Sequence, residues 1–144
     1  MTSLYVDTSA LVKFYYPEQG SDGVEEALLG ADRVYISQLT IVEMASVLMQ
    51  KIRTGDLTKR AETVIWTAFQ DDMNAGNVEL VHLHDRHYVK AADVIREYGK
   101  AHGIKTLDAL HLSIAHGLHA ATFLCSDKVL VRIAAAMGIK IAQR

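Results

Sequence analysis

The sequence of 144 residues contains only one cysteine and one proline. A single cysteine excludes an internal disulfide, which suits a reducing compartment, and we expect a cytoplasmic protein. The start of the sequence lacks the basic segment and long apolar stretch of a signal peptide. The apolar segment at residues 130–144 is interrupted by Arg132 and Lys140 and is too short to cross a membrane. These absences predict a protein with no membrane association.

A strong positive charge is also missing, since the formal net charge is −2 and the isoelectric point is about 6.4. Dedicated non-specific nucleic-acid binders are usually strongly basic. The charge nevertheless does not exclude a nucleic-acid substrate. If a bound metal neutralised four acids, the net charge of the rest would be +2 instead of −2. The length and the 50% hydrophobic content favour one globular domain over residues 1–144.

Short apolar segments alternate with helical patterns along the chain. No hairpin-type turn separates the apolar segments, which favours a mostly parallel five-stranded sheet in an α/β fold with helices on both faces. The expected strands cover residues 4–6, 34–37, 78–81, 122–125 and 139–141. Two long helical patterns, at residues 41–52 and 58–75, have no strand between them. We expect them to form a helical hairpin that projects from the sheet.

Four acidic residues lie where an apolar segment gives way to a helical pattern: Asp7, Glu43, Asp108 and Asp127. Because the carboxyl ends of parallel strands meet at one edge, we expect these four side chains to converge there. Carboxylates at helix N-termini with no histidine or cysteine among them suit Mg²⁺ or Mn²⁺. The pattern predicts a metal site.

Each acid also has an ordinary structural interpretation. Asp7 and Asp127 are suitable helix N-caps, and Asp108 would favour the positive end of its helix. Thr40 and Glu43 match a capping box, in which the Glu43 side chain bonds back to the Thr40 amide. It is the joint placement of the four that favours a metal site, because so many carboxylates at one edge repel each other unless a cation neutralises them.

Three stretches carry a family resemblance: YVDTSALVKFYYPE, LTIVEMASVL and KTLDALHLSIAHGLHAATFLCSDKVL. In this order and spacing they resemble the PIN-domain ribonucleases, and more narrowly the VapC-type toxins of toxin–antitoxin pairs. The match covers nearly the whole chain, with DTSALVK and T-x-DALHL as its most specific parts. The resemblance implies a PIN-like three-layer fold.

The resemblance implies that Asp7, Glu43, Asp108 and Asp127 hold one or two Mg²⁺ or Mn²⁺ ions. Asp7, Asp108 and Asp127 would be direct ligands, whereas Glu43 would bind through water or act as a base. Supporting positions are Thr8, Ser9 and Ser126, and we expect His111 to pack within the fold and help orient Asp108. The family often has a hydroxyl where this chain has Cys125, and that change weakens a supporting hydrogen bond.

The implied activity is hydrolysis of RNA phosphodiester bonds by a toxin that a cognate antitoxin inhibits, in a protein that forms a homodimer. Two alternatives remain, a catalytically weak PIN fold that serves as a protein-interaction module and a nuclease that acts on DNA. Candidate residues for gripping the nucleic acid are Lys13, Lys51, Arg53, Lys105, Lys128 and Arg132.

Other chemistries find less support in the sequence. Histidines at positions 82, 84, 87, 116 and 119 allow a zinc site, but no motif fixes a third ligand. Cys125 has no identifiable partner histidine for nucleophilic catalysis. A haloacid-dehalogenase-like phosphatase needs an aspartate where Ser9 stands, and a phospho-receiver needs one where residues 82–84 read His-Leu-His. The sequence also lacks the P-loop, G-x-G-x-x-G and G-x-S-x-G motifs.

Overall fold

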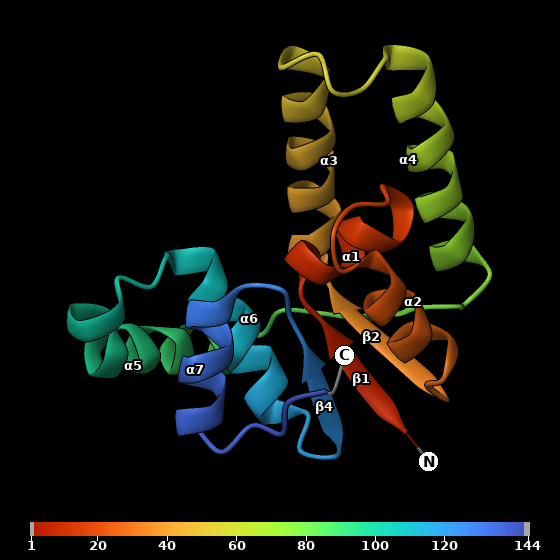
Figure 1. Cartoon of the computed structure of the whole chain (residues 1–144). Coiled ribbons are helices and arrows are strands. Elements are labelled where there is room, and N and C mark those ends of the chain that lie inside the picture. Colours follow the sequence, from red (N-terminus) through yellow and green to blue (C-terminus); the bar gives the residue numbers. More distant parts are fainter. Residues whose placement is uncertain (1, 143–144) are drawn as a thin grey trace.

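The computed structural model describes residues 2–142 and contains one parallel sheet flanked by helices (Figure 1). Its strands stand in the order β3-β2-β1-β4 and all pair in parallel. The strands are β1 (Ser3–Val6), β2 (Arg33–Ser37), β3 (Glu79–Val81) and β4 (Ala121–Leu124). The helices are α1 (Thr8–Tyr15), α2 (Ser21–Leu29), α3 (Gln38–Arg53), α4 (Lys59–Asn74), α5 (Asp85–His102), α6 (Thr106–Gly117) and α7 (Lys128–Ala136).

Alternating side chains of the central strand β1 divide the core into two layers. Leu4 and Val6 point to one face and pack with α1 to α4, whereas Tyr5 points to the other and packs with α5, α6 and α7. Both faces of the sheet are therefore covered, as expected for a parallel sheet. The three-layer α/β prediction is confirmed.

The fifth strand predicted at residues 139–141 is longer than the paired segment that the structure contains. In residues 2–142 this segment makes one isolated parallel bridge, between Phe123 and Ile141, beside the edge strand β4. Two hydrogen bonds hold it, from Phe123 N to Lys140 O and from Ala142 N to Phe123 O. The segment lies where a fifth strand belongs, but within the described residues only Ile141 pairs with β4.

The helical hairpin of α3 and α4 extends away from the sheet, as the sequence predicts (Figure 1). Thr58 caps α4 by accepting a hydrogen bond from Ala61 N at 3.1 Å. Phe69 on α4 and Met44 and Leu48 on α3 are fully buried at the base of the hairpin. No helix within residues 2–142 has the length and apolar character needed to span a bilayer.

Candidate functional site

The strand order brings two of the four acids side by side. The chain runs from β1 outward to β2 and β3 and then returns to β4 on the other side of β1, so the strand order reverses between β1 and β4. The last residues of these strands, Val6 and Leu124, are paired in register. Asp7 directly follows Val6, and Asp127 follows Leu124 by three residues, so both acids lie at the reversal point.

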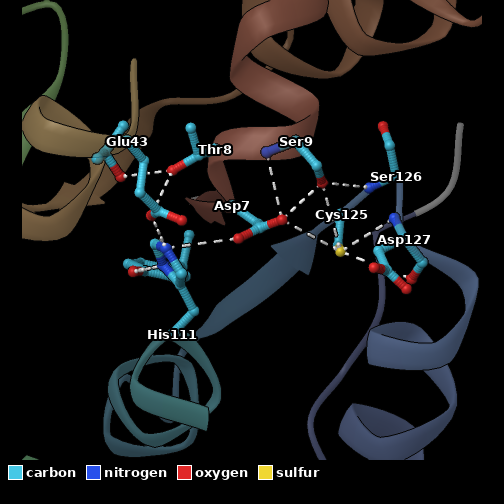
Figure 2. A network of polar contacts seen from close by, with 10 residues as sticks. Asp7, Thr8, Ser9, Glu43, His111, Cys125, Ser126 and Asp127 are labelled. Carbon is cyan, nitrogen blue, oxygen red and sulfur yellow. Dashed lines mark hydrogen bonds and ion pairs between the residues drawn. The ribbon is translucent and has the colours of Figure 1, made fainter. Parts of the chain in front are cut away.

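Asp7 is nearly buried and is held by its own helix turn. Its side chain caps α1, with Oδ2 accepting from Ser9 Oγ at 2.5 Å and from Ser9 N at 3.3 Å. Ser9 Oγ in turn accepts from Ser126 N at 3.2 Å, which links the start of α1 to the end of β4. Figure 2 shows this chain of contacts from Asp7 through Ser9 to Ser126. Ser9 therefore fixes one carboxylate oxygen of Asp7.

Cys125 occupies the space between Asp7 and Asp127. Its thiol donates to Asp7 Oδ2 at 3.5 Å, and its sulfur accepts from Asp127 N at 3.3 Å (Figure 2). Asp127 caps α7, since Oδ1 accepts from Val129 N at 2.9 Å and Leu130 N at 3.1 Å. The cysteine thus links Asp7 and Asp127 through long, weak hydrogen bonds.

Glu43 lies in the second turn of α3, not at a helix start. The helix begins at Gln38 directly after β2, with Ser37 at the N-cap, so the alternative interpretation of Thr40 and Glu43 as a capping box is wrong. Thr8 Oγ1 instead donates to Glu43 Oε1 at 2.9 Å and lies 3.3 Å from Thr40 Oγ1. The position on α3 turns Glu43 toward the start of α1.

His111 is fully buried on α6 and joins two of the acids. Its Nε2 lies 2.5 Å from Glu43 Oε1 and 3.6 Å from Asp7 Oδ1, and its Nδ1 lies 2.7 Å from Tyr5 Oη. The hydrogen bonds of both ring nitrogens thus go to Glu43 and Tyr5, and the role of His111 in orienting Asp108 stays a prediction. Burial disfavours the charged imidazole, but the bond to Glu43 and the charges of the nearby acids outweigh it and raise the pKa of His111.

The hydrogen bonds also set the charge of Glu43. Burial disfavours its ionised form, but the hydrogen bond and charge of His111 and the hydrogen bond from Thr8 outweigh it and hold the pKa of Glu43 below its usual value. Glu43 is therefore a carboxylate at neutral pH.

Asp108 lies in the first turn of α6, whose N-terminus faces the same edge. Burial raises the pKa of Asp108 to about 6, and the negative charges of Asp7, Asp127 and Glu43 add to the effect against the opposing charge of His111. The charges of the other three predicted acids therefore act on Asp108.

This donor set fits a hard divalent cation. Carboxylate oxygens are the ligands that Mg²⁺ and Mn²⁺ prefer, and the mutual repulsion felt by Asp108 is what a cation would relieve. Within residues 2–142, no three side chains of the His, Cys, Asp and Glu type already lie together in a group that could hold a metal ion. The acids surround a shared edge, and only Asp7 and Asp127 have their side chains fixed there by backbone hydrogen bonds.

The histidines considered for zinc have other contacts. His87 Nδ1 accepts from His84 N at 2.9 Å and so closes the first turn of α5. His116 and His119 approach each other edge to face at the far end of α6. Neither pair adds a third ligand among the described residues.

Three of the six basic candidates differ in their distance from the acids along the fold. Lys105 and Lys128 are exposed at the starts of α6 and α7, beside Asp108 and Asp127. Lys51 lies over the Tyr16 ring at 4.1 Å, near the end of α3 that points away from the sheet. The first two therefore lie nearer to the acids than Lys51 does.

Two buried residues belong to the network although the sequence did not place them there: Tyr5 was not considered, and Thr40 was given a different role. Tyr5 and Thr40 contact His111 and Thr8, respectively. The signal for Tyr5 was available, since a tyrosine in a buried strand needs a partner for its hydroxyl. The partner itself, 106 residues away in sequence, follows only from the fold.

Cys125 should resist alkylation in the folded protein. Burial and the neighbouring Asp7 carboxylate raise the pKa of its thiol, and the reactive form is the thiolate. We expect iodoacetamide to leave the native protein unmodified and to label it fully in denaturant, as read by mass spectrometry. Rapid labelling of the native protein would contradict the burial of this side chain.

Comparisons with known proteins agree with this architecture. A family model described as PIN domain matches residues 4–136. No curated protein matches the chain significantly. FitAcB from Neisseria gonorrhoeae is similar over 97% of this chain and 96% of that chain, with a TM-score of 0.70 and 18% identity. VapBC2 from Rickettsia felis, bound to a DNA fragment from their promoter, is similar over 91% and 92%, with a TM-score of 0.65 and 16% identity. A toxin–antitoxin complex from Klebsiella pneumoniae is similar over 86% of both chains, with a TM-score of 0.58 and 16% identity.

Proposed function

The chain belongs to the PIN domain family, and from this premise we propose that it is a metal-dependent endoribonuclease, the toxin of a type II toxin–antitoxin pair. The nuclease domain would take up the whole of residues 1–144. The observation that carries the proposal is the placement of Asp7 and Asp127 after the paired strands β1 and β4, where the charges of Asp7, Asp127 and Glu43 also act on Asp108. Such mutual repulsion is expected where a cation belongs.

In this proposal Asp7, Asp108 and Asp127 hold Mg²⁺ or Mn²⁺, and Glu43 contributes through water or as a base. When bound, the cation supplies Lewis acidity, which makes water a better nucleophile and stabilises the leaving oxygen. Ser9 orients Asp7, and Thr8 and His111 orient Glu43. The N-termini of α6 and α7, with Lys105 and Lys128, provide positive potential for the phosphate of the RNA.

The partner proposed for the chain is an antitoxin protein, together with a second copy of the chain. The supporting observations are the folds it shares with members of toxin–antitoxin complexes and exposed apolar side chains on the helical hairpin. Val42 and Met49 on α3 and Val64 on α4 are 71%, 44% and 65% exposed. Apolar side chains on a projecting element are typical of a contact surface.

The proposal is tested by incubating the protein with a labelled RNA pool in Mg²⁺, in Mn²⁺ or in EDTA, beside single-stranded DNA of the same sequences. We expect cleavage of RNA with either metal and none in EDTA. Preferred cleavage of DNA would change the proposed substrate from RNA to DNA. Cleavage that persists in EDTA would contradict the metal requirement.

A further inference from the structure

One oxygen of the Glu43 carboxylate already has two donors. Thr8 Oγ1 donates to Oε1 at 2.9 Å, and His111 Nε2 lies 2.5 Å from the same oxygen. Figure 2 shows Glu43 between Thr8 and His111, on the side of Asp7 away from Cys125. The second oxygen, Oε2, is the one that these two donors leave available.

The donor on α6 is itself held rigidly. His111 is completely buried, and its Nδ1 lies 2.7 Å from the hydroxyl of Tyr5, which is also completely buried. The Tyr5 ring stacks on Phe123 of the neighbouring strand, with centroids 6.1 Å apart. Tyr5 is two residues before Asp7, so the imidazole is anchored to the strand that carries the first acid.

We infer that His111 is a positioning residue which, with Thr8, holds Glu43 by Oε1 so that Glu43 acts in the reaction through Oε2 alone. The inference rests on the proposed nuclease function and narrows the role of Glu43. With Oε1 engaged, the carboxylate cannot bind a cation through both oxygens. It offers one oxygen, aimed by its two donors, to a water molecule or to the cation. His111 itself is too deeply buried to touch RNA.

Two amide variants separate the functions of the two ring nitrogens. The longer side chain in His111→Gln places an N–H donor near the position of Nε2, within reach of Glu43. The shorter side chain in His111→Asn reaches only the position of Nδ1, near Tyr5. Both variants remove the imidazole and keep a polar group in the buried site, so they differ mainly in the contact to Glu43.

The first measurement needs no metal and no substrate. A double-mutant cycle combines Glu43→Ala with His111→Asn and follows denaturant unfolding in EDTA. We expect coupling of about tenfold in the unfolding equilibrium constant, since the two residues share a charge-assisted hydrogen bond. The cycle that combines Glu43→Ala with His111→Gln should show little coupling, because glutamine keeps a donor to Glu43 and the substitution therefore removes little of the interaction. Additive effects of Glu43→Ala and His111→Asn would overturn the inference, whether or not the protein cleaves RNA.

The second measurement is the kinetics of metal-dependent RNA cleavage. His111→Asn should lower kcat about a hundredfold with KM for RNA nearly unchanged, because a misplaced group costs on the order of a hundredfold. His111→Gln should stay within about tenfold of the parent. Equal losses in the two variants, or an increase in KM alone, would overturn the inference.

If His111→Asn does not fold, Tyr5→Phe replaces it in both measurements. This change keeps the ring stack on Phe123 and removes only the hydroxyl that anchors Nδ1. We expect kcat to fall about tenfold at constant KM, and an unchanged kcat would overturn the inference. If the parent protein cleaves no RNA, the proposed function fails, and the coupling between residues 43 and 111 decides whether the pair is held as inferred.

Discussion

Asp7→Asn should reduce metal-dependent RNA cleavage by on the order of a thousandfold or more. The substitution removes the charge of the acid that follows β1 at the strand reversal and lies 3.6 Å from His111 Nε2. A loss of about 4 kcal/mol of transition-state stabilisation corresponds to a factor of a thousand, and a bound cation contributes several kcal/mol. Initial cleavage rates of a labelled RNA at saturating Mn²⁺ measure the effect.

The variant should keep its fold, which makes the loss interpretable. Asparagine is as good an N-cap as aspartate, and its carbonyl oxygen can accept the same bonds from Ser9 N and Ser9 Oγ. Removing one charge also relieves the repulsion that raises the pKa of Asp108. The melting temperature in EDTA should therefore equal or exceed that of the parent.

Asp93→Asn is the matched control for charge. Asp93 is exposed on α5 and lines a hollow with Ala136 and Met137, at the end of α7 opposite to Asp127. Asp93→Asn changes the net charge by the same amount as Asp7→Asn. It should leave the cleavage rate within about twofold of the parent, as expected for a surface charge away from the site. Cleavage by Asp7→Asn at the parent rate would exclude Asp7 as a ligand.

The sequence predicted the edge at which the acids meet, because that edge follows from local signals. Short apolar segments, the turns after them and the absence of hairpin signals lead to a parallel sheet. The ends of its strands then place Asp7 and Asp127. Their N-cap roles, predicted as the ordinary interpretation, are present together with their shared position. In these residues the structural role and the proposed chemical one do not exclude each other.

The environment of Glu43 was not predictable from the same signals. The pattern of Thr40 and Glu43 matches a capping box, yet α3 starts at Gln38 immediately after β2. The hydroxyl of Thr40 faces Thr8 on another helix, and Glu43 bonds to residues 35 and 68 positions away. Local patterns carry no information on such long-range partners, so the pairing of His111 with Glu43 emerged only from the fold.

Asp108→Asn should be more stable than the parent without metal and less stable than the parent when metal is added. Without metal, the folded parent carries Asp108 with a pKa of about 6 instead of 3.8, so folding costs free energy whenever this group is ionised. The full shift would correspond to about 3 kcal/mol. Because Asp108 is only half-buried, solvent screening reduces this to about 1 to 2 kcal/mol. Losing a carboxylate from the first turn of α6 costs about 0.3 to 1 kcal/mol in return. We expect a net gain of about 1 kcal/mol at pH 7 in EDTA.

The pH dependence identifies the source of this gain. A raised folded pKa means that the native protein binds more protons than the unfolded chain between about pH 4 and pH 6. The free-energy cost that Asp108 imposes on folding of the parent is therefore absent near pH 4 and complete above pH 6. The advantage of Asp108→Asn should grow over this interval and stay constant above it. The control is Asp22→Asn, an exposed acid in the first turn of α2, which should show no gain at any pH.

Adding Mn²⁺ should favour the parent, because a ligand that binds only the folded state stabilises it by about 2.7 kcal/mol at a hundred times its dissociation constant. The variant has lost one of the proposed ligands and should respond much less. Differential scanning calorimetry at pH 7, in EDTA and over a Mn²⁺ titration, should thus show the variant melting higher without metal and the parent melting higher with it. A parent melting curve that does not move with Mn²⁺ would count against the site itself. Equal shifts in both proteins would leave the site in place and remove Asp108 from it. Only a reversal in the order of the two melting temperatures requires that the Asp108 carboxylate both destabilises the metal-free protein and binds the cation.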